Sequence, residues 1–518
     1  MKFNCDYSLF HHQLQHDFGF EEFLKSLQIK STFLANHKLK VLTKSQASLQ
    51  YQKISTALEH FSKNKLQKIV EYFNQIPNID YMDSDVSNSS LDQVQCKQLA
   101  EFCLLNIKIK QIEESFCKPT VSLNDHDILN ILRDNMQDDF LAFKTSNKLS
   151  KSKTDLEKCN DRYDSELKRF ESEISQKTGL KLYYPYKKEV QFSQSLYESV
   201  RQCPHLTSEV KHDLIILDYQ PSSELLQIIN EKDSFLDNYN LEISKIQSRI
   251  NALLQPYLIK FSKYLETRKQ DLLIYSLSFF CYQSHLCVPK LIDQGLQFND
   301  ARMFALAKDN IDYKPLNFES KLGASILFGA NMTGKTTVLK TLYFHFCLIQ
   351  LGLPLPASSV ECFFPSEVLL KLKNSGSLTK GLSSFGEEIE FWTQKFEDNA
   401  VILCDELFLN TEPSAGELIS KVFLDYIKTK NVFFMCSSHY TNLFDLDDIK
   451  LFYMKSLANN KSIDRHSLLK QIPFELAPLK KDDKLSLQNM KNEAIEMALC
   501  FDIPQSIKDQ LKDHLKGQ

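Results

Sequence analysis

Hydrophobic positions in the first part of the chain recur every three or four residues, the period of a helix with one buried face. Within residues 1–140 this pattern predicts helices over 47–76 and 91–117. A loop rich in Asp, Ser and Asn separates them at 80–90. A Phe-x-Glu pattern at Phe20 falls in an amphipathic stretch, and we interpret it as part of a helix face. Residues 1–140 are therefore expected to form a helical N-terminal region without chemistry of its own.

Two longer amphipathic helices are predicted within residues 141–295, which we assign to a helical core and lever. The first helix is predicted to open with a capping box at Thr154–Glu157 and to end at Gly179. An extended stretch and a tip follow, and the second helix runs from about Ser234, with Pro256 expected to kink or break it. The stripe of apolar residues along each of these helices, which we call the seam, is long. Its length favours an antiparallel lever arm, and core helices of a bundle are the alternative.

The pattern changes beyond residue 296, where short apolar runs alternate with helical stretches. Such runs lie at 325–328, 400–404 and 430–436. Alternation of this kind predicts a parallel sheet of the α/β class, which binds ligands at the carboxyl ends of its strands. We assign residues 296–465 to this α/β domain and residues 466–518 to a C-terminal helical segment.

Composition narrows the class of protein. A chain of 518 residues with only 12 glycines and 15 prolines is expected to be rich in helix and to hold several domains. A net charge of -4 gives no general attraction to nucleic acid. The 13 cysteines are scattered without CxxC spacing, which predicts reduced, buried thiols and a cytoplasmic protein.

Membrane segments are not expected. The N-terminus lacks the charged and apolar regions of a signal peptide. The longest apolar run, residues 272–282, is interrupted by Ser276 and Ser278 and is too short to span a bilayer, so it predicts a buried helix.

A phosphate-binding loop follows the first apolar run of the α/β domain. Residues 329–337 have the spacing G-x-x-x-x-G-K-[ST], in which glycines let backbone N–H groups face phosphates at a helix N-terminus. Lys335 is expected to reach the β- and γ-phosphates and Thr336 to place its hydroxyl on Mg²⁺. The predicted ligands are therefore ATP and Mg²⁺, contacted by Gly329, Asn331, Met332, Thr333, Gly334, Lys335, Thr336 and Thr337.

Acidic and polar residues end the next two apolar runs. Asp405 is expected to hold Mg²⁺, and Glu406 to orient or deprotonate the attacking water. His439 would sense the γ-phosphate or position water, with a structural role as the alternative. Ser383 and Ser384, in a loop that opens a helix, would donate to a phosphate or cap that helix.

These motifs, in this order, resemble the ATPase domain of the MutS family, a branch of the ABC-type ATPases. The resemblance is specific over residues 270–518, architectural over 140–270 and absent before that. It rests on the segments 271–289, 299–304, 329–337, 351–357, 381–389, 405–406, 438–440 and 494–504.

The resemblance implies roles for individual residues. Glu406 would be the general base, His439 a switch histidine and Asp405 a Mg²⁺ ligand. Tyr313 would stack on adenine. Ser383 or Ser384 would act on a partner's nucleotide, which implies a homodimer or a heterodimer with a MutS-like partner, joined through the C-terminal segment.

The sequence departs from the family after the acidic pair. Residues 408–415 lack the family's G-R-G-T-S-x-x-D, and only Thr411 and Gly416 remain. No mismatch-reading domain is recognisable, and the lever tip is short for a DNA clamp.

Two functions follow from the resemblance. The first is an ATP-driven dimeric clamp on DNA structure, related to mismatch repair or recombination. The alternative is an ATP-dependent remodelling factor for a protein client, similar to the reactivase of a cobalamin-dependent aminomutase. An SMC-type ATPase is disfavoured, since only 70 positions separate Lys335 from Asp405 (405 minus 335) and no long coiled coil fits between them.

Overall fold

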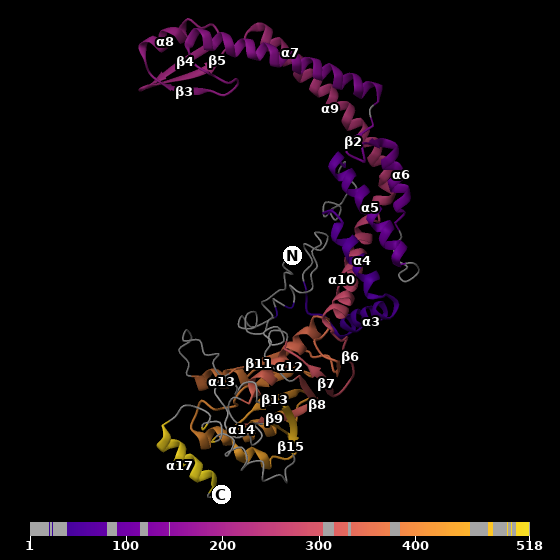
Figure 1. Cartoon of the computed structure of the whole chain (residues 1–518), viewed down its shortest axis with the longest axis vertical. Helices are drawn as coiled ribbons and strands as arrows, with labels where there is room; N and C mark the ends of the chain where they lie inside the picture. Colours follow the sequence, from indigo (N-terminus) through magenta and orange to yellow (C-terminus); the bar gives the residue numbers. More distant parts are fainter. Residues whose placement is uncertain are drawn as a thin grey trace. The chain divides into compact units, whose positions relative to one another are not determined.

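The computed structural model describes most of the chain in two compact units (Figure 1). One unit comprises residues 1–76, 111–117 and 267–518, and the other comprises residues 77–110 and 118–266. The residues described are Phe20, Phe23, 39–79, 91–113, 123–144, 146–303, 315–329, 333–372, 384–455, 475–479, 495, 499 and 504–516. The four-part division predicted above stays a prediction.

The second unit contains the two long helices that the seam predicts, drawn in purple to magenta in Figure 1. α7 (Asn147–Thr178) and α9 (Ser223–Leu258) pack side by side. They are antiparallel, because Arg169, near the end of α7, lies 3.9 Å from Glu224 at the start of α9, whereas Arg162, earlier in α7, pairs with Glu231, later in α9, at 2.8 Å. α5 (Gln93–Glu113), α6 (Asp125–Asn135) and the β1–β2 hairpin (Met136–Gln137, Ala142–Phe143) also lie here, α5 ending in the first unit.

The predicted start of the first long helix is wrong. Ser146 caps α7 by accepting from Leu149 N at 3.1 Å, whereas Thr154 lies inside the helix and donates to Ser150 O. Gly179 ends α7 in the left-handed conformation, as predicted, with φ 69°. α9 likewise begins earlier than predicted, at a cap on Ser222, and ends two residues after Pro256.

The tip between α7 and α9 is a small antiparallel sheet with one helix. Its strands are β3 (Lys188–Gln191), β4 (Leu206–Lys211) and β5 (Leu214–Tyr219), in the order β3-β5-β4, and its helix is α8 (Gln194–Arg201). A buried cluster that includes Phe170 of α7 and Leu225 of α9 joins the tip to the helix pair.

The first unit is built around a six-stranded sheet, as predicted for an α/β domain. Its order is β11-β12-β13-β9-β14-β15, with the first five strands parallel and β15 antiparallel. The strands are Val368–Lys371, Val401–Cys404, Phe433–Ser437, Gly323–Phe328, Lys450–Lys455 and Glu475–Leu479. β15 thus lies within the segment 466–518, for which only helix was predicted.

Helices and a second sheet complete this unit. Its helices include α3 (Lys44–His60), α4 (Lys63–Gln75), α10 (Phe261–Ser284, which begins in the other unit), α12 (Lys335–Gln350), α13 (Ser384–Trp392), α14 (Pro413–Ile427) and α17 (Gln505–Lys516), with a short 3-10 helix at Thr441–Asp445. The second sheet has the order β6-β10-β7-β8, with strands Lys290–Leu291, Ser359–Cys362, Leu296–Ala301 and Leu316–Ser320. No helix among the described residues is long and apolar enough to cross a bilayer.

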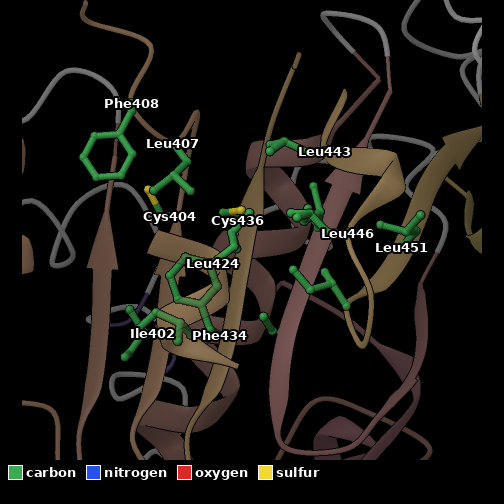
Figure 2. Packing of buried hydrophobic residues seen from close by; sticks show 14 of the residues in the cluster. Ile402, Cys404, Leu407, Phe408, Leu424, Phe434, Cys436, Leu443, Leu446 and Leu451 are labelled. Atoms are coloured by element: carbon green, nitrogen blue, oxygen red, sulfur yellow. The ribbon is translucent and has the colours of Figure 1, made fainter. Parts of the chain in front are cut away.

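The core beneath the predicted site is apolar and fully buried. Figure 2 shows Ile402 and Cys404 of β12 beside Phe434 and Cys436 of β13, with Leu424 of α14 packed against them. The described cysteines are free and mostly buried, as predicted. This packing fixes the strands whose carboxyl ends carry the predicted chemistry.

Candidate active site

The phosphate-binding loop connects β9 to α12 through two glycines with positive φ. Gly329 has φ 148° and Gly334, which precedes α12, has φ 98°. A Cβ at Gly329 would also lie 3.0 Å from Thr333 Oγ1 and from Met454 Cβ. Both positions therefore need glycine, as the motif predicts. Asn331 and Met332 lie outside the described residues.

Lys335 opens α12 with its side chain turned back over the loop. Its ammonium donates to Gly329 O at 2.7 Å, and the residue is buried although it is charged. A buried ammonium that closes a ring of loop backbone is placed to contact an anion held by that loop. Thr337 is the third residue of α12 and accepts, through its carbonyl, from Thr341 Oγ1.

Thr336 and Asp405 meet across the sheet edge. Thr336 Oγ1 donates to Asp405 Oδ2 at 2.8 Å, and Ser437 Oγ donates to Asp405 Oδ1 at 2.7 Å. β13 lies between β12 and β9, so three parallel strands deliver Asp405, Ser437 and the loop to one edge. Asp405 is 9% exposed. The two residues expected to hold Mg²⁺ are thus hydrogen-bonded to each other, with Ser437 on the second oxygen of Asp405.

Glu406 adopts a left-handed backbone, with φ 59°, directly after Asp405. Its N–H donates to Ser437 Oγ at 2.8 Å. Its carboxylate Oε1 lies 3.4 Å from His439 Nε2, and the two side chains are 11% and 34% exposed. The structure therefore brings together Glu406 and His439, the two residues expected to act on the attacking water.

Ser437 is a site residue that the sequence analysis missed. Its hydroxyl connects the Asp405 carboxylate to the Glu406 backbone, and the residue is fully buried. The sequence signal that could have identified Ser437 is its position at the end of the apolar run 433–436, close to the predicted His439. A serine there is common enough that spacing alone does not single it out.

Two further predicted contacts lie partly or wholly outside the described residues. Tyr313 and Ser383 fall outside them, and so does the side chain of Ser384, whose backbone opens α13. Their expected roles on adenine and on a partner's nucleotide stay predictions.

The donor set fits a magnesium nucleotide. Mg²⁺ prefers a few oxygen ligands from protein and takes the rest from phosphates and water. A hydroxyl and a carboxylate 2.8 Å apart at Thr336 and Asp405 supply such oxygens beside a loop whose two glycines have positive φ. The described part of the chain contains no cluster of three or more His, Cys, Asp or Glu side chains that could hold a metal ion by themselves.

Comparison with known families agrees with this geometry. The MutS domain V family matches residues 325–512, a range that runs from β9 into α17 and includes the loop, Asp405 and His439. Residues 325–512 belong to the MutS domain V family. MutS domain V is an ABC-type P-loop ATPase domain, so the class of enzyme predicted from the motifs is confirmed.

Relatives found by similarity include several proteins named endonuclease MutS2. The protein from Caldicellulosiruptor saccharolyticus is 23% identical over 246 residues, 46% of this chain and 29% of the relative. That from Streptococcus uberis is 27% identical over 255 residues, 46% of this chain and 32% of the relative. A shorter match to the Staphylococcus epidermidis protein is 30% identical over 144 residues, 27% of this chain and 18% of the relative. The matched part of the chain thus spans a third or less of each.

Proposed function

We propose that the chain hydrolyses ATP to ADP and phosphate at the MutS domain V site, with Mg²⁺ as cofactor. The observation that carries this proposal is the convergence of Thr336, Asp405 and Glu406 at the sheet edge that holds the phosphate-binding loop. A P-loop alone would support nucleotide binding. A carboxylate beside the cation site, with a histidine at 3.4 Å, adds the means to activate water.

Each residue has a separate task in this mechanism. Lys335 and the loop N–H groups hold the β- and γ-phosphates, while Thr336 and Asp405 hold Mg²⁺, which neutralises charge on the phosphates when bound. Glu406 accepts a proton from the attacking water. His439, beside Glu406 Oε1, orients that carboxylate and the water. Ser437 fixes one oxygen of Asp405, so that the carboxylate presents the other toward Thr336.

We further propose that the active form is a dimer, a homodimer or a heterodimer with a MutS-like partner. Ser384, the first residue of α13, and Ser383, which precedes it in the sequence, would contact the nucleotide of the second subunit. Tyr313 would stack on the adenine. Hydrolysis would then be coupled to opening and closing of the α7–α9 levers.

The client that we favour is DNA of a particular structure, in a process related to mismatch repair or recombination. Support comes from the antiparallel helix pair with a folded tip, which suits a clamp, and from the relatives, whose name describes them as endonucleases. The second candidate is remodelling of a protein client, as in reactivation of a cobalamin-dependent aminomutase. The net charge of -4 favours this alternative, because it provides no general attraction to DNA.

The test is steady-state ATP hydrolysis by the purified full chain, alone and with duplex, mismatched and branched DNA. Glu406→Gln removes the proposed base but keeps the size of the side chain, and Glu397→Gln makes the same change at an exposed carboxylate of this domain. We expect Glu406→Gln to reduce hydrolysis at least about 100-fold while nucleotide still binds. Glu397→Gln should match the wild type.

The measurements with DNA distinguish a DNA client from a protein client. Stimulation by one class of DNA that is lost in Glu406→Gln supports the clamp. Hydrolysis that depends on Glu406 but responds to none of the DNAs rejects the clamp and favours a protein client. Equal hydrolysis by wild type and Glu406→Gln would reject the proposed active site itself.

A further inference from the structure

The backbone of Phe408, two residues after the proposed base, is hydrogen-bonded on both sides of its Cα. Its N–H donates to Glu388 Oε1 at 2.7 Å, and its carbonyl accepts from the Tyr440 hydroxyl at 2.9 Å. Glu388 comes from α13 and Tyr440 comes from the segment after β13, next to His439. Side chains from two separate elements therefore hold the two successive peptide groups that meet at the Phe408 Cα, in the segment that carries Glu406.

This segment needs external support because its backbone is strained. Glu406 and Phe408 have φ of 59° and 50°, in a left-handed region that costs a residue with a side chain about 1 kcal/mol. Leu407 N, between them, donates to Ser437 O at 3.2 Å. Conformations of this kind persist only where their surroundings determine them. The direction of the Glu406 side chain thus depends on the contacts made at residues 407 and 408.

The Phe408 side chain anchors the same segment to the core. Figure 2 shows Phe408 and Leu407 at the edge of the buried cluster, and Phe408 is 1% exposed. Its ring packs edge-on against Phe423 of α14 at 5.7 Å. Packing fixes the ring, and the two hydrogen bonds fix the orientations of the 407–408 and 408–409 peptide groups, which set the direction of the chain toward Glu406.

Packing alone does not explain why the Glu388 carboxyl is buried. It is 3% exposed, and burial raises the pKa of its carboxyl above the ordinary value, while the hydrogen bond from Phe408 N and the charge of Lys371 act in the opposite direction. A buried carboxyl is costly unless it is hydrogen-bonded. The bond to Phe408 N is the contact at 2.7 Å that compensates this cost.

We propose that Glu388 and Tyr440 are positioning residues that hold Glu406 in its working orientation by fixing the peptide groups on the two sides of the Phe408 Cα. The proposal rests on the proposed ATP hydrolysis. Glu388 lies one helical turn after Ser384 on α13, so a shift of α13 is passed to the Phe408 peptide and on to Glu406. Hydrolysis at Glu406 then depends on the position of α13, and the start of α13 is expected to face a partner's nucleotide.

The test compares Glu388→Ala, Glu388→Gln and Tyr440→Phe with the wild type in the full chain. Glutamine keeps an oxygen that accepts from Phe408 N, whereas alanine does not. Tyr282→Phe is the matched control for Tyr440→Phe, because the Tyr282 hydroxyl also donates to a backbone carbonyl, that of Leu58, at 2.9 Å. The readouts are kcat, ATP affinity, the melting temperature and hydrogen exchange of the Phe408 amide without nucleotide.

We expect Glu388→Ala and Tyr440→Phe each to lower kcat about tenfold with ATP affinity changed less than about twofold. Glu388→Gln should restore most of kcat, and Tyr282→Phe should leave kcat unchanged. Exchange of the Phe408 amide should be faster in Glu388→Ala than in Glu388→Gln. If Glu388→Ala does not fold, wild-type kcat in Tyr440→Phe alone overturns the proposal.

Two results would overturn the proposal. One is wild-type kcat in both Tyr440→Phe and Glu388→Ala, and the other is equal exchange of the Phe408 amide in Glu388→Ala and Glu388→Gln. The exchange measurement needs no hydrolysis, so it separates this inference from the proposed function. If wild type and Glu406→Gln hydrolyse ATP equally, the proposed function fails, whereas a change in exchange alone would still establish that Glu388 holds the Phe408 peptide.

Discussion

The Thr336 hydroxyl donates to Asp405 Oδ2 at 2.8 Å, although 69 positions of sequence separate the two residues. The contact exists because β12, β13 and β9 are parallel neighbours, so that Asp405 and the start of α12 lie at the same edge of the sheet. The second carboxylate oxygen accepts from Ser437. Both oxygens of Asp405 are thus oriented by protein groups before any cation binds, which reduces the reorganisation that binding requires.

Asp405→Asn should separate cation binding from nucleotide binding. The amide has one acceptor oxygen in place of two and directs N–H groups at Thr336 or Ser437, so it is a poor Mg²⁺ ligand. We expect kcat to fall about 100-fold and half-maximal activity to require several times more Mg²⁺, with ATP still bound by the Lys335 loop. A magnesium titration of hydrolysis measures this. Thr336→Ser keeps the hydroxyl and should titrate as the wild type does; an unchanged titration in Asp405→Asn would contradict the assignment.

Ser437→Ala should reduce hydrolysis through geometry alone. The serine hydroxyl joins Asp405 Oδ1 at 2.7 Å to the Glu406 N–H at 2.8 Å, and its loss leaves both groups without that contact. We expect kcat to fall about tenfold and stability to fall by about 1–3 kcal/mol, since buried polar groups lose a partner. Steady-state kinetics and urea unfolding measure the two effects.

Ser325→Ala is the control for this change. Ser325 is a fully buried serine on β9, the strand next to β13, and its hydroxyl has no hydrogen-bond partner among the described residues. Its loss should leave kcat unchanged and stability within about 1 kcal/mol of the wild type. A kcat that drops equally in both variants would assign the effect to buried-strand packing instead of the Ser437 hydroxyl.

The sheet and the centre of the site could be predicted because their signals are local. Continuous apolar runs such as 400–404 specify strands buried on both faces, and the G-x-x-x-x-G-K-T spacing specifies a loop before a helix. Parallel pairing then forces Asp405 and His439 to the edge that holds Lys335. These steps need no knowledge of distant contacts.

The remainder of the site depends on contacts that spacing does not encode. Ser437 becomes a site residue only because β13 lies between β12 and β9, and Glu388 only because the chain turns back at Phe408. The predicted cap at Thr154 failed for a related reason. A capping sequence is equally compatible with the inside of a helix, where Thr154 bonds the carbonyl of Ser150, once Ser146 caps an earlier turn.

Folding stability should rise between about pH 4 and pH 6.5 through His345, a fully buried residue of α12. Burial lowers the pKa of His345 from 6.5 to about 4, so protons bind the unfolded chain more tightly in this range. Its share of stability is fully present well above pH 6.5 and is lost progressively as the pH falls from about 6.5 to about 4. The loss between pH 7 and pH 5 is about 2 kcal/mol.

His345→Phe tests this assignment. The side chain packs edge-on against Phe298 at 5.7 Å, and phenylalanine fits such a contact without a titrating group. The difference in free energy of unfolding between wild type and variant, measured by urea at pH 5 and pH 7, cancels other titrating groups. We expect that difference to change by about 2 kcal/mol between the two pH values in favour of the variant at pH 5. An equal difference at both values would show that His345 does not titrate in this way.

Gly416→Ala should destabilise the protein, although alanine normally stabilises a helix by about 1 kcal/mol relative to glycine. Gly416 lies in the first turns of α14 with an ordinary helical backbone, so no strain requires glycine there. A Cβ would stand 2.6 Å from Phe408 O and closer still to the Tyr440 hydroxyl, the two groups that bond each other. The clash therefore reverses the usual sign and gives a net loss of about 1–3 kcal/mol.

The same substitution should slow hydrolysis, because it displaces the Phe408 carbonyl and the Tyr440 hydroxyl together. Gly179→Ala provides the comparison. It places a methyl group where no atom lies within 4 Å, so its cost is confined to the left-handed backbone at φ 69°. We expect Gly179→Ala to lower stability by about 1 kcal/mol with kcat unchanged, and Gly416→Ala to lower both. A Gly416→Ala variant more stable than the wild type would mean that the segment after Glu406 moves to accept the methyl group, and that the Phe408 peptide is not held in place as described.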